Sequence, residues 1–161
     1  MEYTEWTITD CIKKVNQTLF LPDIQRPYVW KEDDIYLLYD SICRDYPINT
    51  VLFWHLEKNT IKKAKYIKRI KFIEQRYNEN IEEKGPLLRD IYYLVIDGQQ
   101  RITSFFLSLQ GTYKIYQKKK YVDAELYFNF LSGLEENENE ILYEFKFFPA
   151  TDNDVWVETI E

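Results

Sequence analysis

The stretch Ile91-Tyr92-Tyr93-Leu94-Val95-Ile96, which runs directly into Asp97-Gly98-Gln99-Gln100-Arg101, decides the fold of this 161-residue chain. Its first six residues are apolar or aromatic without interruption, which is typical of a buried strand. The Asp-Gly step that follows is a turn signal. Apolar residues then recur at helical spacing, at Ile102, Phe105, Phe106 and Leu109. The sequence therefore predicts a strand, a tight turn and a helix from about residue 100, with Gly111 placed to end it.

Two helices are predicted ahead of this unit. Thr7 and Asp10, three residues apart, form a capping box at the start of a helix over about residues 8–16. A second helix has an acidic first turn, which the helix dipole favours. Its apolar stripe consists of Ile35, Leu38 and Ile42.

Further strands are expected at residues 18–24, 51–56, 125–130 and 141–148. Apolar residues at helical spacing also predict an amphipathic helix over residues 67–81. Helices and strands alternate, so we expect an α/β or α+β fold in which helices flank a small mixed sheet. The length suits a single domain over residues 1–161.

Composition excludes several classes of protein. Hydrophobic residues make up 45% and charged residues 30% of the chain, which excludes a disordered tail. No apolar stretch is long enough to cross a bilayer, and the N-terminus lacks the basic start of a signal peptide. We therefore expect a soluble cytoplasmic protein with no membrane partner.

The few cysteine and histidine residues exclude much metal and thiol chemistry. Cys11 and Cys43 both lie in helical patterns and are expected to be small buried residues. His55 lies in an apolar, strand-like run and is expected to pack there rather than to catalyse. Zinc fingers, His-Cys nucleophilic pairs and His-metal nuclease centres therefore lack their parts within this chain.

A basic segment interrupts an otherwise acidic chain of net charge −6. Residues 58–76 carry eight basic residues against Glu74, a net charge of +7, which leaves −13 for the remainder. Such a block could follow a phosphate backbone, with Lys62, Lys63 and Lys65 as candidate DNA contacts. The alternative is a solvated helix face or a hairpin insertion over residues 58–86.

The turn at Asp97 is the first candidate site. A helix N-terminus attracts phosphate, and Gly98 allows a ligand to approach the backbone closely. Arg101 in the first turn opposes the helix dipole, a conflict that a bound anion would offset. Asp97 could hold a divalent metal or orient a water molecule, while Gln99 and Gln100 offer amides to a base, ribose or phosphate. The alternative is an ordinary turn in which Asp97 is the helix N-cap.

The second candidate site is Leu21-Pro22-Asp23-Ile24-Gln25-Arg26-Pro27-Tyr28-Val29-Trp30. Arg26 stands near Tyr28 and Trp30, between two prolines that stiffen the chain. Arginine among aromatic rings is suited to gripping phosphates and stacking bases. The alternative is a loop whose aromatic residues fill the core and whose arginine pairs with an acidic neighbour.

The two clusters together carry a family resemblance. The motif Ile24–Trp30, about seventy residues before the motif Val95–Thr103, resembles the DUF262 family. This is the ParB/sulfiredoxin-like N-terminal domain of GmrSD-type modification-dependent restriction enzymes. The resemblance covers essentially the whole chain, although residues 58–86 look like an insertion between family strands.

The resemblance implies a domain that binds and hydrolyses a nucleoside triphosphate with Mg²⁺, where GTP, UTP and CTP all stay open. The catalytic residues it implies are Asp97, Gln100 and Arg101, with Asp97 as the metal ligand. The nucleotide-binding residues it implies are Gln25, Arg26, Gly98, Gln99 and Arg101. In some relatives, aromatic residues of the first motif help sense phosphorothioate-modified DNA, and the matching positions here are Tyr28 and Trp30.

Two functions remain open from the sequence. One is a nucleoside triphosphatase that regulates DNA restriction, and the other is a non-catalytic module that binds modified DNA or senses a nucleotide. Relatives often continue into a C-terminal HNH-type nuclease domain. Residues 155–160 are still apolar, so we expect this chain to be the N-terminal part of a longer protein.

Overall fold

The computed structural model describes residues 5–64, 66–138 and 140–149. These residues form two three-stranded sheets, with the strand orders β1-β3-β2 and β4-β5-β6. The strands are β1 (Leu19–Phe20), β2 (Leu52–Glu57), β3 (Ile91–Asp97), β4 (Tyr113–Gln117), β5 (Lys120–Phe128) and β6 (Phe145–Pro149). The helices are α1 (Ile8–Lys14), α2 (Glu32–Cys43), α3 (Lys58–Lys63) and α4 (Gln99–Leu109). The fold is α+β, as predicted.

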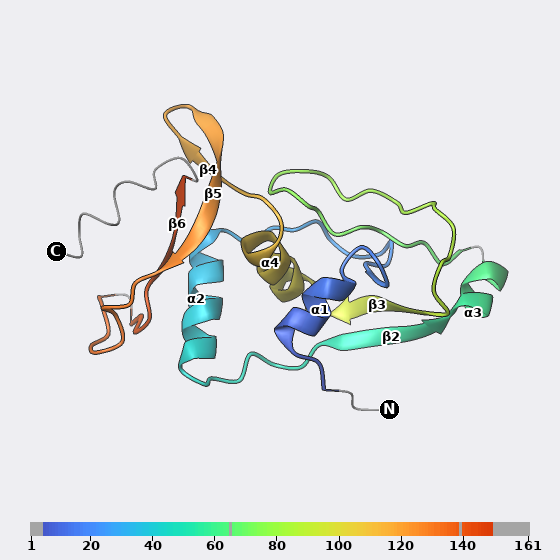
Figure 1. Cartoon of the computed structure of the whole chain (residues 1–161), viewed down its shortest axis with the longest axis horizontal. Helices are drawn as coiled ribbons and strands as arrows, with labels where there is room; N and C mark the ends of the chain where they lie inside the picture. Colours follow the sequence, from blue (N-terminus) through green and yellow to red (C-terminus); the bar gives the residue numbers. More distant parts are fainter. Residues whose placement is uncertain (1–4, 65, 139, 150–161) are drawn as a thin grey trace.

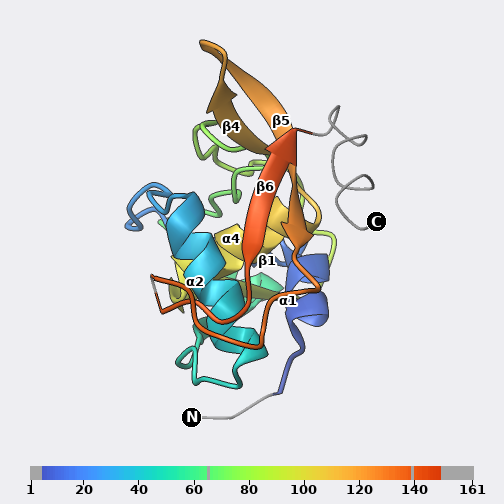
Figure 2. The ribbon, with the colours of Figure 1, turned by 90° about the vertical axis from the view of Figure 1, so that its left-hand side faces the viewer.

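The first sheet is mixed and the second is antiparallel. In the first, β3 pairs in parallel with β1 and antiparallel with β2. In the second, β5 pairs antiparallel with both neighbours. Helices α2 and α4 lie between the two sheets (Figure 1). The view turned by 90° shows β6 in front of α4 and beside α2 (Figure 2).

Helix α4 is buried on almost every side because it contributes to both cores. Ile102 and Phe105 pack in a core with Val95 of β3. Leu107 packs in the other core with Phe147 of β6. A helix in this position has no solvated face, so the polar residues of its first turn must find partners inside the protein.

The starts predicted for α1, α2 and α4 are confirmed. The Thr7 hydroxyl accepts a hydrogen bond from the Asp10 amide at 3.1 Å and donates one to the Asp10 carboxylate at 2.7 Å. The hydroxyl and the backbone amide of Thr7 both donate to the Asp10 carboxylate, which lowers the pKa of Asp10 below its usual value. Helix α2 has the predicted acidic first turn, formed by Glu32, Asp33 and Asp34, and α4 begins within one residue of the predicted start.

The strands at residues 51–56 and 91–96 form as predicted, but their expected burial is only partly correct. Val95 and its inward-facing neighbours on β3 are buried, whereas Trp54 and His55 of β2 are exposed. Strand β2 is one of the two edge strands of this sheet. The His55 ring stacks on Tyr93, with 5.4 Å between the ring centroids.

The predicted helix over residues 67–81 is wrong, and the strand at 18–24 is reduced to β1 and a bridge at Leu21. The backbones of Leu21 and Ile70 exchange hydrogen bonds of 2.8 Å in both directions. The Glu83 amide donates to the Arg69 carbonyl at 2.7 Å, so residues 69–71 run beside residues 81–83. Pairing of the backbone with distant segments therefore overrides the local helical spacing, and the hairpin alternative describes this segment better.

The last strands begin and end at other residues than predicted, and β4 was not predicted. Cys11 and Cys43 are both unbridged, and Cys43 is exposed rather than buried. Burial raises the pKa of Cys11 to about 11. The apolar stretch 155–160 lies outside the described residues. Within the part of the chain that the structure describes, no helix is long and apolar enough to cross a membrane.

Candidate functional site

The two sequence motifs lie against each other. The Gln25 side-chain amide donates to the Ile96 carbonyl at 2.9 Å, at the end of β3. In return, the Gln99 side-chain amide donates to the Arg26 carbonyl at 2.8 Å. Segments that are seventy residues apart in the sequence are therefore joined by hydrogen bonds, as the pairing of the motifs suggested.

The Gln100 side chain forms three hydrogen bonds between the two motifs. Its side-chain oxygen accepts from the amides of Val29 at 2.9 Å and Trp30 at 3.4 Å. Its side-chain nitrogen donates to the Pro27 carbonyl at 3.2 Å. The side chain is buried, so its amide is used to hold the first motif. The buried oxygen of Gln99, by contrast, has no hydrogen-bond partner among the described residues.

Gly98 shapes the turn between β3 and α4. It is the N-cap of α4 and has a φ of +91°, a conformation that other residues adopt only at a cost. A Cβ atom there would lie 2.9 Å from Val51 Cγ2. No side chain caps α4, so the alternative in which Asp97 is the N-cap is wrong. The N–H groups of the first turn are left to an external acceptor.

Asp97 and Arg101 differ sharply in their surroundings. The Arg101 guanidinium donates to the carbonyls of Asn49 and Thr50, each at 2.9 Å, and to that of Ile48. Its side chain is 13% exposed, whereas that of Asp97, 3.8 Å away, is 72% exposed. Arg101 therefore anchors residues 48–50, and Asp97 presents a carboxylate to solvent.

The residues of the first motif also differ in burial. Tyr28 is 7% exposed, and its hydroxyl lies 2.8 Å from Ser104 Oγ. Burial raises the pKa of Tyr28 to about 12. Trp30 is half-buried against the cores. Arg26 is exposed, and no acidic group of the described residues forms an ion pair with it. Tyr28 thus fills the core as one alternative expected, while Arg26 lacks the acidic neighbour that this alternative required.

Arg76 supports the first motif, a role that the sequence did not reveal. Its guanidinium donates to the Trp30 carbonyl at 2.9 Å. It also lies over the rings of Tyr28 and Tyr77, at 4.9 and 4.4 Å from their centroids. The only sequence signal was its membership of the basic segment.

The basic segment does not form one charged surface. Arg69 is buried over the ring of Phe20. Two lysines form ion pairs, Lys68 with Asp23 at 2.6 Å and Lys71 with Glu83 at 3.3 Å.

Lys62 and Lys63 are exposed on α3, and Lys65 lies outside the described residues. Helix α3 follows Glu57, which pairs with Ile91, whereas Asp97 pairs with Leu52 at the other end of the β2–β3 ladder. The structure therefore does not bring Lys62 and Lys63 to the turn at Asp97.

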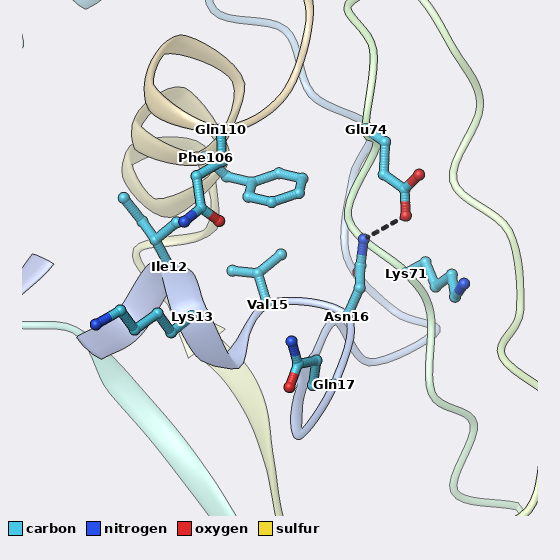
Figure 3. Close-up of a pocket in the computed structure, with 9 residues that line it drawn as sticks. All are labelled: Ile12, Lys13, Val15, Asn16, Gln17, Lys71, Glu74, Phe106 and Gln110. Atoms are coloured by element: carbon cyan, nitrogen blue, oxygen red, sulfur yellow. Dashed lines mark hydrogen bonds between the residues drawn. The ribbon is translucent and has the colours of Figure 1, made fainter. Parts of the chain in front are cut away.

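A cavity of about 520 Å³ lies at the opposite end of α4 from the turn. The cavity is surrounded by Phe106 of α4, the C-cap residue Gln110, Val15 and Asn16 after α1, and Glu74 (Figure 3). Asn16 donates to Glu74 at 3.3 Å across its edge (Figure 3). This cavity belongs to neither motif. Among the described residues, no three His, Cys, Asp or Glu side chains are grouped to hold a metal ion.

Comparison with known proteins gives the chain its family. The family described as the GmrSD restriction endonuclease, N-terminal domain, matches residues 8–158. A stretch of 104 residues, 63% of the chain, is 33% identical to the uncharacterized protein MJ0686 of Methanocaldococcus jannaschii. That stretch spans 16% of the length of the archaeal protein. Since the family match extends from α1 to beyond β6, the chain belongs to the N-terminal domain family of GmrSD restriction endonucleases.

Proposed function

We propose that this chain binds a nucleoside triphosphate with Mg²⁺ at the turn between β3 and α4 and hydrolyses it, as the regulatory domain of a modification-dependent restriction system. One observation carries the proposal. The uncapped N-terminus of α4 lies beside Arg26, which has no acidic partner among the described residues, and beside the exposed Asp97. Free N–H groups, a free guanidinium and a solvent-facing carboxylate are the groups that a metal-bound phosphate chain requires.

Each residue of the turn has a distinct role in this proposal. The first-turn N–H groups of α4 and the Arg26 guanidinium bind phosphate oxygens, and Gly98 lets the phosphates approach the backbone. Asp97 holds the metal or orients the attacking water. A single carboxylate fits Mg²⁺, because this ion often takes its other ligands from phosphates and water. When bound, Mg²⁺ supplies charge neutralisation at the phosphates.

Gln100 and Arg101 act as positioning residues in this arrangement. Gln100 holds residues 27–30 against α4, which keeps Arg26 beside the helix N-terminus. Arg101 holds residues 48–50, and Val51 packs against Gly98. Gln99 keeps one buried oxygen without a partner among the described residues, and a nucleotide hydroxyl or amino group could donate to it.

The first test is calorimetric titration of the chain with ATP, GTP, CTP and UTP in the presence of Mg²⁺. Arg26→Ala should weaken binding at least tenfold and leave Tm unchanged, since its side chain is exposed and makes no ion pair with a described residue. Arg89→Ala, which removes an exposed arginine before β3, is the matched control and should bind like the wild type. Unchanged affinity in Arg26→Ala would refute the assignment.

Hydrolysis is tested separately, by phosphate release. Asp97→Asn should abolish turnover and retain most of the fold, because the carboxylate is exposed. Arg101→Ala should lower both binding and Tm, because it also releases residues 48–50. Full turnover by Asp97→Asn would refute the role of Asp97, and no turnover by the wild type would restrict the domain to binding.

A second candidate function is a non-catalytic module that senses modified DNA. It is favoured by the apolar side chains beside Arg26, because Ile24 is 87% and Val29 is 51% exposed. An apolar rim beside a guanidinium suits a poorly hydrated group on a phosphate backbone. Ile24→Ser should then weaken binding to a phosphorothioate duplex relative to an unmodified one, with nucleotide affinity unchanged.

A further inference from the structure

The β4–β5 hairpin extends beyond the second sheet as a two-stranded ribbon. Strand β6 pairs with residues 124–128 of β5, whereas residues 120–123 pair only with β4. Residues 114–123 therefore lie outside the three-stranded part. Both views show this hairpin projecting from the body of the molecule (Figures 1 and 2).

The end of the ribbon carries positive charge that the described residues do not neutralise. Lys118, Lys119 and Lys120 are exposed, and none forms an ion pair with a described residue. Lys114 lies 3.9 Å from Asp123 across the ladder. Residues 114–123 have a net charge of +3, so the rest of the chain carries −9. The charge of the ribbon is therefore opposite to the net charge of the rest of the chain, which favours an approach to a polyanion with the ribbon first.

The turn at the end of the ribbon is built from unfavourable residues. Gln117 pairs with Lys120, so Lys118 and Lys119 form a two-residue loop, with φ values of +49° and +65°. Such loops favour Asn-Gly, because other residues adopt positive φ at a cost of roughly 1–2 kcal/mol each. Lysines at both positions give up that stability, and they add charge at the outermost point of the hairpin.

Aromatic side chains cover one face of the ribbon and connect it to the first motif. Tyr116 and Tyr121 are cross-strand partners with centroids 5.2 Å apart, and both are exposed. Tyr77 lies 4.5 Å from Tyr121, and the Arg76 guanidinium lies over Tyr77 and Tyr28. Tyr121, next to the loop end of the ribbon, is therefore linked through Tyr77 and Arg76 to the first motif.

We propose that the β4–β5 ribbon is a DNA-contacting element, with Lys118, Lys119 and Lys120 on the phosphates of a duplex. A two-stranded ribbon fits the major groove of B-form DNA, about 12 Å wide, but not the deep, narrow major groove of A-form RNA. Lysine binds phosphate as a point charge without reading sequence. The inference rests on the proposed function only in its choice of DNA as the partner.

The test is fluorescence anisotropy of the chain with an unmodified duplex of about 20 base pairs, without nucleotide, at several salt concentrations. Each phosphate contact contributes about 0.9 to the slope of log K against log salt. Replacing Lys118, Lys119 and Lys120 by Gln should therefore lower the slope by about 2 to 3 and weaken binding at least tenfold at low salt. Replacing Lys58, Lys62 and Lys63 by Gln makes the same change in charge near α3 and should alter affinity less than twofold.

A second variant separates a binding role from a structural one. Lys118→Asn with Lys119→Gly supplies the preferred turn residues, so it should raise Tm while it weakens DNA binding. A raised Tm with unchanged affinity would overturn the proposal. Equal losses in the ribbon and α3 variants, no binding by the wild type, or tighter binding of an RNA duplex would also overturn it.

The nucleotide titration keeps the two proposals apart. The ribbon variant should bind nucleotide like the wild type, whereas Arg26→Ala should keep the salt slope of DNA binding. If Arg26→Ala binds nucleotide normally while the ribbon variant loses DNA, the proposed nucleotide site fails and the ribbon proposal stands.

Discussion

The junction of the two motifs and the β4–β5 ribbon use polar residues in opposite ways. In the junction, the side chains of Gln25, Gln99 and Gln100 donate to backbone carbonyls of the other motif. In the ribbon, Lys118 and Lys119 are exposed and form no ion pair with a described residue. A polar residue in a motif can therefore hold two segments of the fold together or contact a ligand. Its hydrogen-bond partners show which of these roles it has.

The position of each region explains the difference. The first turn of α4 lies between β3 and residues 25–30, so an unbonded amide there would be buried at a cost. The ribbon extends beyond β6, and none of the described residues forms an ion pair with Lys118, Lys119 or Lys120 at its end. Variants that remove a hydrogen bond between the two motifs should therefore lower stability, and variants at the end of the ribbon should weaken DNA binding.

Gln100→Leu should have the largest effect on stability. It removes the partners of the Val29 and Trp30 amides and of the Pro27 carbonyl, and unsatisfied groups cost about 1–3 kcal/mol each when buried. We expect a loss of about 3 kcal/mol in the free energy of unfolding, measured by urea denaturation. Gln110→Leu, the same change at the exposed C-cap of α4, should cost far less. Equal losses of stability in the two variants would show that the hydrogen bonds of Gln100 do not hold the two motifs together.

Gly98→Ala should have the next largest effect. Alanine at a φ of +91° is strained, and its Cβ would lie 2.9 Å from Val51. We expect a loss of about 2 kcal/mol, together with weaker nucleotide binding because the turn must shift. Gly85→Ala is the control, since its new Cβ meets only the end of the flexible Glu83 side chain. A stable Gly98→Ala variant would contradict the strain at the turn.

Tyr28→Phe should have a smaller effect. It keeps the buried ring and removes the hydroxyl bonded to Ser104, whose own hydroxyl still donates to the Gln100 carbonyl. The expected loss is about 1 kcal/mol, with nucleotide and DNA binding unchanged. Tyr116→Phe, on the exposed face of the ribbon, should leave stability unchanged. If Tyr28→Phe impairs binding while the fold is intact, the residue contacts a ligand and is more than a core residue.

Local signals predicted α1, α2 and α4, but not α3. Helix α1 follows from its capping box, and α4 follows from its apolar spacing after the Asp-Gly turn. These features depend on residues three or four positions apart, so they are visible in the sequence. The contact between the motifs was suggested only by the family resemblance.

Several features that the sequence did not reveal depend on distant partners. The role of Gln100 depends on backbone groups seventy residues away. Residues 67–81 have helical spacing, but Ile70 pairs with Leu21 and Glu82. The ribbon was missed because Lys118-Lys119 lacks the Asn-Gly signal of a two-residue hairpin loop.

The smallest expected effect on stability comes from the capping box of α1, whose hydrogen bonds are exposed to solvent. The bonds from the Thr7 hydroxyl and amide lower the pKa of Asp10. Because the pKa is lower in the folded state, Asp10 stabilises the fold above its unfolded value of about 3.9. This contribution is lost as the pH falls through the folded pKa. Asp10→Ala should therefore be slightly less stable than the wild type at pH 6, and urea denaturation at pH 3 should show a smaller difference. A difference that stays constant with pH would mean that the carboxylate charge does not contribute.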